Sequence, residues 1–143
     1  MTKTYRAYIS GFARGITEAI SDQAFHGPSS MTARLLSKDA LKEDLAQELG
    51  TAEENIEIGP SEDTLSDHLA KYGWSREHTW NLNRRLGFVI GKPSQLLLVE
   101  AGEDVLDGYS GFGKGNGPFY FTEDLFIAVY KDVALLFIVG NDE

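Results

Sequence analysis

A glycine-rich stretch is the first feature of the sequence that could do chemistry. Five of the chain's fifteen glycines fall within residues 108–117. Glycine lets a backbone approach a ligand closely, and successive backbone amides can hold a phosphate with help from a nearby lysine. This pattern predicts a small-ligand or phosphate-metabolite binding domain or enzyme as an alternative function. Its candidate ligand-binding residues are Tyr109, Gly111, Gly113, Lys114 and Gly115.

The same stretch departs from known phosphate-binding motifs. Gly108, Gly113 and Lys114 have P-loop spacing, but Gly115 stands where that motif has Ser or Thr. A strand rather than a helix is expected to follow, whereas both the P-loop and the dinucleotide-binding fingerprint open a helix. The competing interpretation is a structural loop that leads into a strand.

The usual catalytic and metal-binding patterns are absent from the sequence. The three histidines are His26, His68 and His78, and none has the spacing of a zinc site. Ser110 lacks the spacing of a nucleophile elbow, and the acids of residues 100–107 lack the alternation of a calcium loop. We therefore predict no catalytic residue, metal or cofactor. Whether the chain is an enzyme stays open, with a non-catalytic function favoured.

Aromatic and basic residues gather near the middle of the chain. Tyr72 and both tryptophans, Trp74 and Trp80, fall within nine residues and are followed by Arg84 and Arg85. Tryptophan, tyrosine and arginine dominate protein–protein binding energy. In the competing interpretation, Trp80 closes the core between helix and sheet, while the arginines are solvated or pair with acids.

Charge is distributed unevenly along the chain. There are 22 acidic and 13 basic residues, a net charge of −9. Residues 36–72 and 93–143 each carry −7, and residues 73–92 between them carry +3. Nucleic-acid binding needs clustered Lys and Arg, so we expect no nucleic-acid partner. One interpretation of the acidic blocks is that their side chains cap helices and keep the surface solvated. The other is that one block forms a negative face that steers a basic protein.

These features favour a small, acidic, cytoplasmic binding protein that engages or neutralises a basic protein partner. Small inhibitor and immunity proteins offer an analogy of size and charge only. A homodimer closed by the final hydrophobic strand is a further hypothesis. The predicted partner-binding residues are Asp39, Glu43, Asp44, Glu53, Glu54, Asp63, Asp67 and Trp74.

Composition limits the class of protein. The 143 residues suit one domain, and 42% are hydrophobic, which is too many for a disordered acidic tail. The lack of cysteine excludes disulfides and thiolate metal sites. The longest apolar run, Val133 to Val139, is far shorter than the roughly 20 residues of a membrane span. With no targeting signal visible, we expect a cytoplasmic protein without a membrane partner.

Periodicity predicts helices first and strands last. An early strand or irregular start precedes the first predicted helix, and Gly11 and Gly15 weaken helix there. Helices are predicted over 16–25, 38–49, 61–72 and 75–85, capped by Ser37, Ser61 and Ser75. Strands are predicted over 56–58, 88–90, 96–99, 119–121, 125–130 and 133–139. The prediction is one α+β domain, 1–143, with N-terminal helices packed on a C-terminal, mostly antiparallel sheet.

Overall fold

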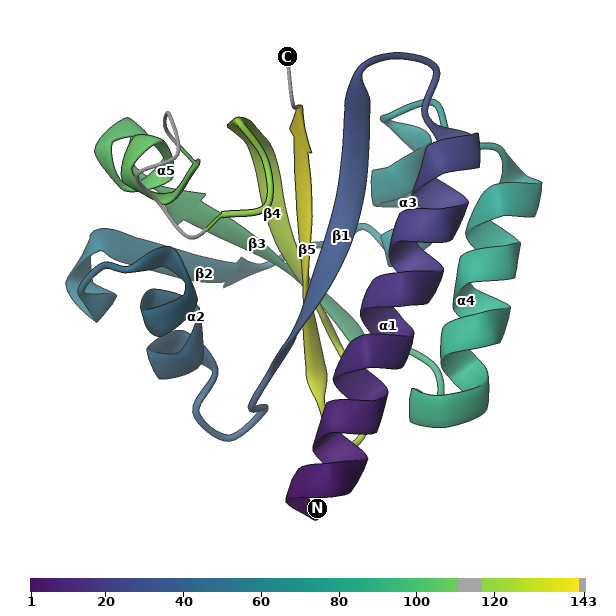
Figure 1. The fold of residues 1–143 in the computed structure, drawn as a ribbon, viewed down its shortest axis with the longest axis horizontal. Helices are drawn as coiled ribbons and strands as arrows, with labels where there is room; N and C mark the ends of the chain where they lie inside the picture. The colour runs from purple at the N-terminus through teal and green to yellow at the C-terminus, as the bar shows by residue number, and fades with distance from the viewer. Residues whose placement is uncertain (111–116, 142–143) are drawn as a thin grey trace.

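The computed structural model describes residues 1–110 and 117–141, in which one antiparallel sheet lies between two layers of helices (Figure 1). The strands are arranged in the order β1-β5-β4-β3-β2. Their bounds are Ser29–Leu36 (β1), Ile56–Pro60 (β2), Gln95–Ala101 (β3), Phe121–Val129 (β4) and Ala134–Asn141 (β5). The helices are Lys3–Ala24 (α1), Leu41–Leu49 (α2), the 3-10 turn Glu53–Asn55 (η1), Leu65–Ala70 (α3), Arg76–Ile90 (α4) and Glu103–Ser110 (α5). The predicted α+β class with an antiparallel sheet is confirmed.

Strand β5 is the centre of the core. It pairs with β1 on one side and β4 on the other, and its residues from Ala134 to Gly140 are all buried. Side chains alternate along a strand, so the two faces of β5 enter different apolar clusters. Leu135 and Phe137 enter the first apolar cluster, and Leu136 and Ile138 enter the second. The sequence of this strand is apolar on both faces, which is typical of a central strand, and β5 lies between β1 and β4.

Each apolar cluster is closed by its own helices. On one face, α1, α3 and α4 contribute residues such as Ile20, Leu69 and Leu82. On the other face, α2 and α5 contribute Leu45 and Tyr109. Figure 1 shows the two helical layers on opposite sides of the sheet. Within the described ranges, no helix has the length and apolar content that crossing a bilayer requires.

The predicted irregular start of the chain is wrong, because α1 begins at Lys3 and runs unbroken to Ala24. The side chain of Thr2 accepts a hydrogen bond from the Tyr5 amide and caps the helix. Gly11 and Gly15 both lie on its exposed side, so each costs about 1 kcal/mol of helix propensity without interrupting the buried stripe. Tertiary packing of that stripe outweighs the cost.

The predicted strand over 88–90 is also wrong, because those residues form the last turn of α4. The helix continues past Gly87 to Ile90 and is capped by Gly91, whose φ of 79° is a backbone conformation that glycine adopts without strain. Ile90 packs against the first apolar cluster, which accounts for the extra turn. The strand at 96–99 is confirmed as part of β3, paired with β2 and β4.

Three further boundaries differ from the prediction. Strand β1, which begins at Ser29, was missed. Ser37 and Ser61 do not cap helices: α2 begins at Leu41, and Thr64 caps α3.

Substitution of a β5 core residue should destabilise the protein strongly. Leu136→Ala removes a fully buried side chain, and we expect it to lower the free energy of unfolding by about 2–5 kcal/mol. Leu98→Ala on β3, where the side chain is 38% exposed, is the matched control and should cost about 1 kcal/mol or less. Urea unfolding followed by circular dichroism measures both. Equal losses would contradict the central position of β5.

Candidate functional site

The seven acids predicted to bind a partner do not share one surface. Five of them, Asp39 to Glu54, lie on or beside α2 and η1, which cover the second apolar cluster. Asp63 and Asp67 lie at the start of α3, which covers the opposite face of the sheet. The sheet therefore separates these acids into two groups, and their role in binding a partner stays a prediction.

A different set of acids comes together instead. Helix α5 packs beside α2, and the Tyr109 hydroxyl of α5 donates a 2.8 Å hydrogen bond to Glu48 of α2. With η1, these helices carry eight acidic residues and one basic residue, Lys42, for a net charge of −7. We call this surface the acidic layer. Its acids are Glu43, Asp44, Glu48, Glu53, Glu54, Glu103, Asp104 and Asp107.

Few acids of this layer are neutralised internally. In the described part of the chain, ion pairs reach only Asp44, 3.7 Å from Arg6, and Glu48, 3.4 Å from Arg34. The helices of the opposite layer, α1, α3 and α4, carry six basic and four acidic residues, a net charge of +2. The molecule is thus electrostatically polarised across its sheet.

The remaining predicted acids have local structural roles. Asp63 accepts a 2.6 Å hydrogen bond from the Lys71 ammonium. Asp67 and Thr64 form a reciprocal capping box at the start of α3. Hydrogen bonds from the Thr64 backbone and side chain hold the pKa of Asp67 below its usual value. Both residues therefore stabilise α3.

The two tryptophans have the opposite environments to those predicted. Trp74, the predicted partner anchor, is only 5% exposed and meets Phe25 edge-to-face at 5.6 Å between ring centroids. Trp80, expected to close the core, is 60% exposed. The helical spacing of α4 indicates that Trp80 is exposed, because Leu82 and Leu86 face the core and Trp80 lies on the other side of the helix from both.

The glycine-rich alternative falls mostly outside the described residues. Gly111, Gly113, Lys114 and Gly115 all lie there. Tyr109 is buried, and its hydroxyl is engaged with Glu48, so it packs α5 onto α2 rather than lining an open site. The amide of Gly117 donates a 2.8 Å hydrogen bond to the Tyr109 carbonyl, and a Cβ at position 117 would lie only 2.7 Å from that oxygen.

A partly buried polar cluster links α3 to β4 and was missed by the sequence analysis. A carboxylate can only accept, so His68 Nε2 donates to Asp124 Oδ2 at 2.8 Å, and the Tyr72 hydroxyl donates to the same oxygen at 2.5 Å. Asp124 follows a register shift in the pairing of β4 with β5. The helical spacing of His68 and Tyr72 places them on one face, but Asp124 lies more than fifty residues further along.

This cluster lacks the surroundings of a catalytic site. His68 Nδ1 is buried without a hydrogen-bond partner in the part of the chain that is described. A hollow of about 410 Å³ beside Asp124 also contains Glu100 and Glu123, but His68 does not line it. Among the described residues, no group of three or more His, Asp or Glu side chains could hold a metal ion. We assign the cluster to tying α3 onto the sheet.

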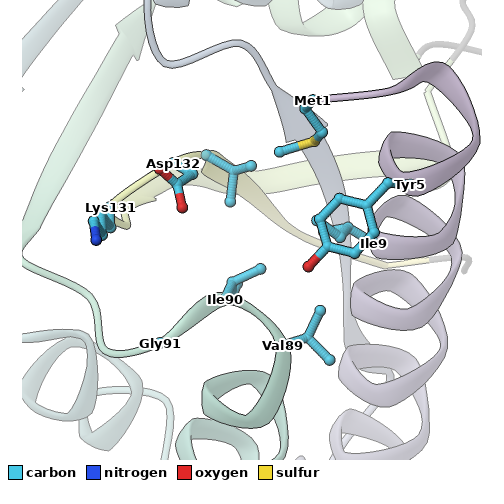
Figure 2. Close-up of a pocket in the computed structure, with 9 residues that line it drawn as sticks. Met1, Tyr5, Ile9, Val89, Ile90, Gly91, Lys131 and Asp132 are labelled. Atoms are coloured by element: carbon cyan, nitrogen blue, oxygen red, sulfur yellow. The ribbon is translucent and has the colours of Figure 1, made fainter.

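A second hollow, of about 260 Å³, lies where α1 begins and α4 ends (Figure 2). Tyr5 and Ile9 of α1 face Ile90 of α4 across it, with Lys131 and Asp132 of the turn between β4 and β5 at its edge. Most of its lining is apolar, and it contains one lysine and one carboxylate. That pair alone forms no catalytic or metal-binding arrangement.

Comparison with known proteins adds no functional information. No protein-family model, curated protein or solved structure matches the chain. The proposed function therefore rests on the residues of this chain and their geometry.

Three tyrosines should make the protein unstable at alkaline pH. Burial, the Asp124 hydrogen bond and the Asp124 charge raise the pKa of Tyr72. Burial, the Glu48 charge and the Glu48 hydrogen bond raise the pKa of Tyr109, and burial alone raises that of Tyr130. Because unfolded tyrosines lose protons near pH 10 while these folded ones keep theirs, stability is complete below about pH 10 and falls above it.

Urea unfolding between pH 8 and 11 measures this effect. The Tyr72→Phe and Tyr109→Phe variants should each lose less stability than wild type over that range. Tyr120→Phe, at a 38% exposed position, is the control. If all four proteins lose stability equally with rising pH, these tyrosines are not its cause.

Proposed function

We propose that this protein is a non-catalytic binding protein whose acidic layer engages a basic protein partner. The observation that carries the proposal is the meeting of α2, η1 and α5 on one side of the sheet with a net charge of −7. Six of its eight acids have no ion-pair partner in the described residues, so their charge is available to a partner.

The mechanism proposed is electrostatic steering followed by steric blocking. A surface dominated by one sign of charge raises the rate at which an oppositely charged protein arrives. A polyanion such as nucleic acid would be repelled by the same layer, which supports a basic protein as the partner. We also propose a cytoplasmic location, since a chain without cysteine gains no disulfide from an oxidising compartment.

A charge-neutralising variant tests the proposal. The protein and a fourfold variant, Glu43→Gln, Glu54→Gln, Asp104→Asn and Asp107→Asn, would be used to capture partners from host lysate at low salt. A basic protein retained by the wild type should be lost by the variant. With the purified partner, the variant should reduce the association rate at least tenfold at low salt. The wild-type rate should fall as salt shortens the Debye length.

The matched control neutralises four exposed acids elsewhere. These are Asp22→Asn, Glu57→Gln, Glu62→Gln and Glu77→Gln, which change the net charge by the same amount. This control should still capture the partner. Equal loss by both variants would show that only total charge matters, and failure of the wild type to capture any basic protein would reject the proposal.

A further inference from the structure

The outward side of α4 carries a stripe of two aromatic rings and an arginine. Trp80, Arg84 and Phe88 follow one another at intervals of four residues, so they lie along one side of the helix. Trp80 is 60% exposed and Phe88 is 75% exposed. The guanidinium carbon of Arg84 lies 5.2 Å from the Trp80 ring centroid and 5.7 Å from that of Phe88. The two rings therefore hold the guanidinium in place at the surface.

The positive charge around this stripe is not neutralised within the described structure. Arg76, Arg84 and Lys92 take part in none of the ion pairs of the described residues. Asp67 of α3 lines the same hollow as Arg76 and accepts the capping-box hydrogen bond from the Thr64 amide, so the positive charge without a neighbouring acid in the hollows is that of Arg84 and Lys92. An arginine held between rings but without a carboxylate is suited to bind an anion from outside.

Two hollows meet at Trp80 and form a groove between α3 and α4. One has a volume of about 400 Å³ and includes Arg76, and the other has a volume of about 450 Å³ and includes Arg84 and Lys92. Ser66, Trp80 and Asn83 line both. Trp80 thus stands at the middle of the groove, with Arg84 and Lys92 towards one end and Arg76, beside Asp67, towards the other.

We propose that this α3–α4 groove binds an extended acidic segment of a partner protein. An apolar side chain of the segment contacts Trp80, one carboxylate pairs with Arg76, and a second pairs with Arg84 and Lys92. The binding mode is separate from the acidic layer, which lies across the sheet, and does not rest on that layer's proposed function.

The spacing of the arginines defines the segment. Arg76 and Arg84 are eight residues apart on a helix, which is about 12 Å along its axis. An extended chain covers that length in about four residues, and its side chains at positions 1, 3 and 5 point the same way. The matching pattern is acid–x–apolar–x–acid, with the apolar residue opposite Trp80.

Charge distinguishes this partner from nucleic acid. Exposed aromatic rings beside arginine also suit single-stranded nucleic acid. A chain with a net charge of −9 opposes a long polyanion, whereas a short segment with two carboxylates meets only the local positive charge. An acidic protein segment is therefore the favoured occupant.

Labelled peptides test the proposal by fluorescence anisotropy with the full chain. The probe has the core Asp-Ser-Leu-Ser-Asp flanked by glycine and serine, and two control peptides replace both acids by Asn or the Leu by Gly. The probe should bind at least tenfold more tightly than either control peptide. No saturable binding up to millimolar protein, or equal binding of all three peptides, would overturn the proposal.

Variants within α4 provide a matched comparison. Arg84→Gln and Trp80→Ala should each weaken probe binding at least tenfold. Arg85→Gln makes the same charge change at the next residue, which lines neither hollow, and should change binding less than twofold. Both arginines are exposed, so neither variant should disturb folding. If Arg85→Gln weakens binding as much as Arg84→Gln, the peptide is held by general electrostatic attraction and not at a specific site. That result would overturn the proposal.

Two other occupants would give distinct results. Tighter binding of a single-stranded oligouridine probe than of the acidic peptide would overturn the proposal in favour of nucleic acid. Dimers in light scattering at low salt that disappear in Arg84→Gln would assign the groove to a second copy of the chain and also overturn it. The fourfold acidic-layer variant described above should bind the probe at least as tightly as wild type. That result separates this groove from the proposed function of the acidic layer.

Discussion

The burial of β5 on both faces is the constraint on which the architecture depends. A strand whose side chains are apolar in both directions must be covered twice, and β5 is flanked by strands while helices close each face. The chain therefore needs two helical layers. Each helical layer exposes its own polar side chains to solvent. The molecule therefore has two separate surfaces, one on each side of the sheet.

Those two surfaces differ in charge because acidic and basic segments of the chain pack on opposite faces of the sheet. Helices α2 and α5 are separated by more than fifty residues, yet both return to the same face and bring acids from both acidic blocks together. The intervening α3 and α4 cross to the opposite face and take the basic block with them. The His68–Asp124 hydrogen bond helps to fix that crossing by attaching α3 to β4.

Prediction succeeded where local chemistry decides the structure. The strands around 56–58, 96–99, 125–130 and 133–139 were recognised from apolar content and turn residues, and Ser75 was recognised as a helix cap. It failed where packing outweighs propensity. Glycines within α1 and α4 suggested boundaries, but both helices continue because their buried sides meet the sheet. Strand β1 was overlooked because its partner in the sheet, β5, lies about a hundred residues further along the sequence.

From the order of the residues one can read the amount of charge, its division into acidic and basic blocks, and the apolar character of both faces of the last strand. Packing in three dimensions sets which acids share a surface, buries Trp74, and leaves Trp80 exposed beside Arg84. The physical reason is that periodicity relates residues within one helix or strand. The face of the sheet that each helix covers depends instead on packing between segments far apart in the chain.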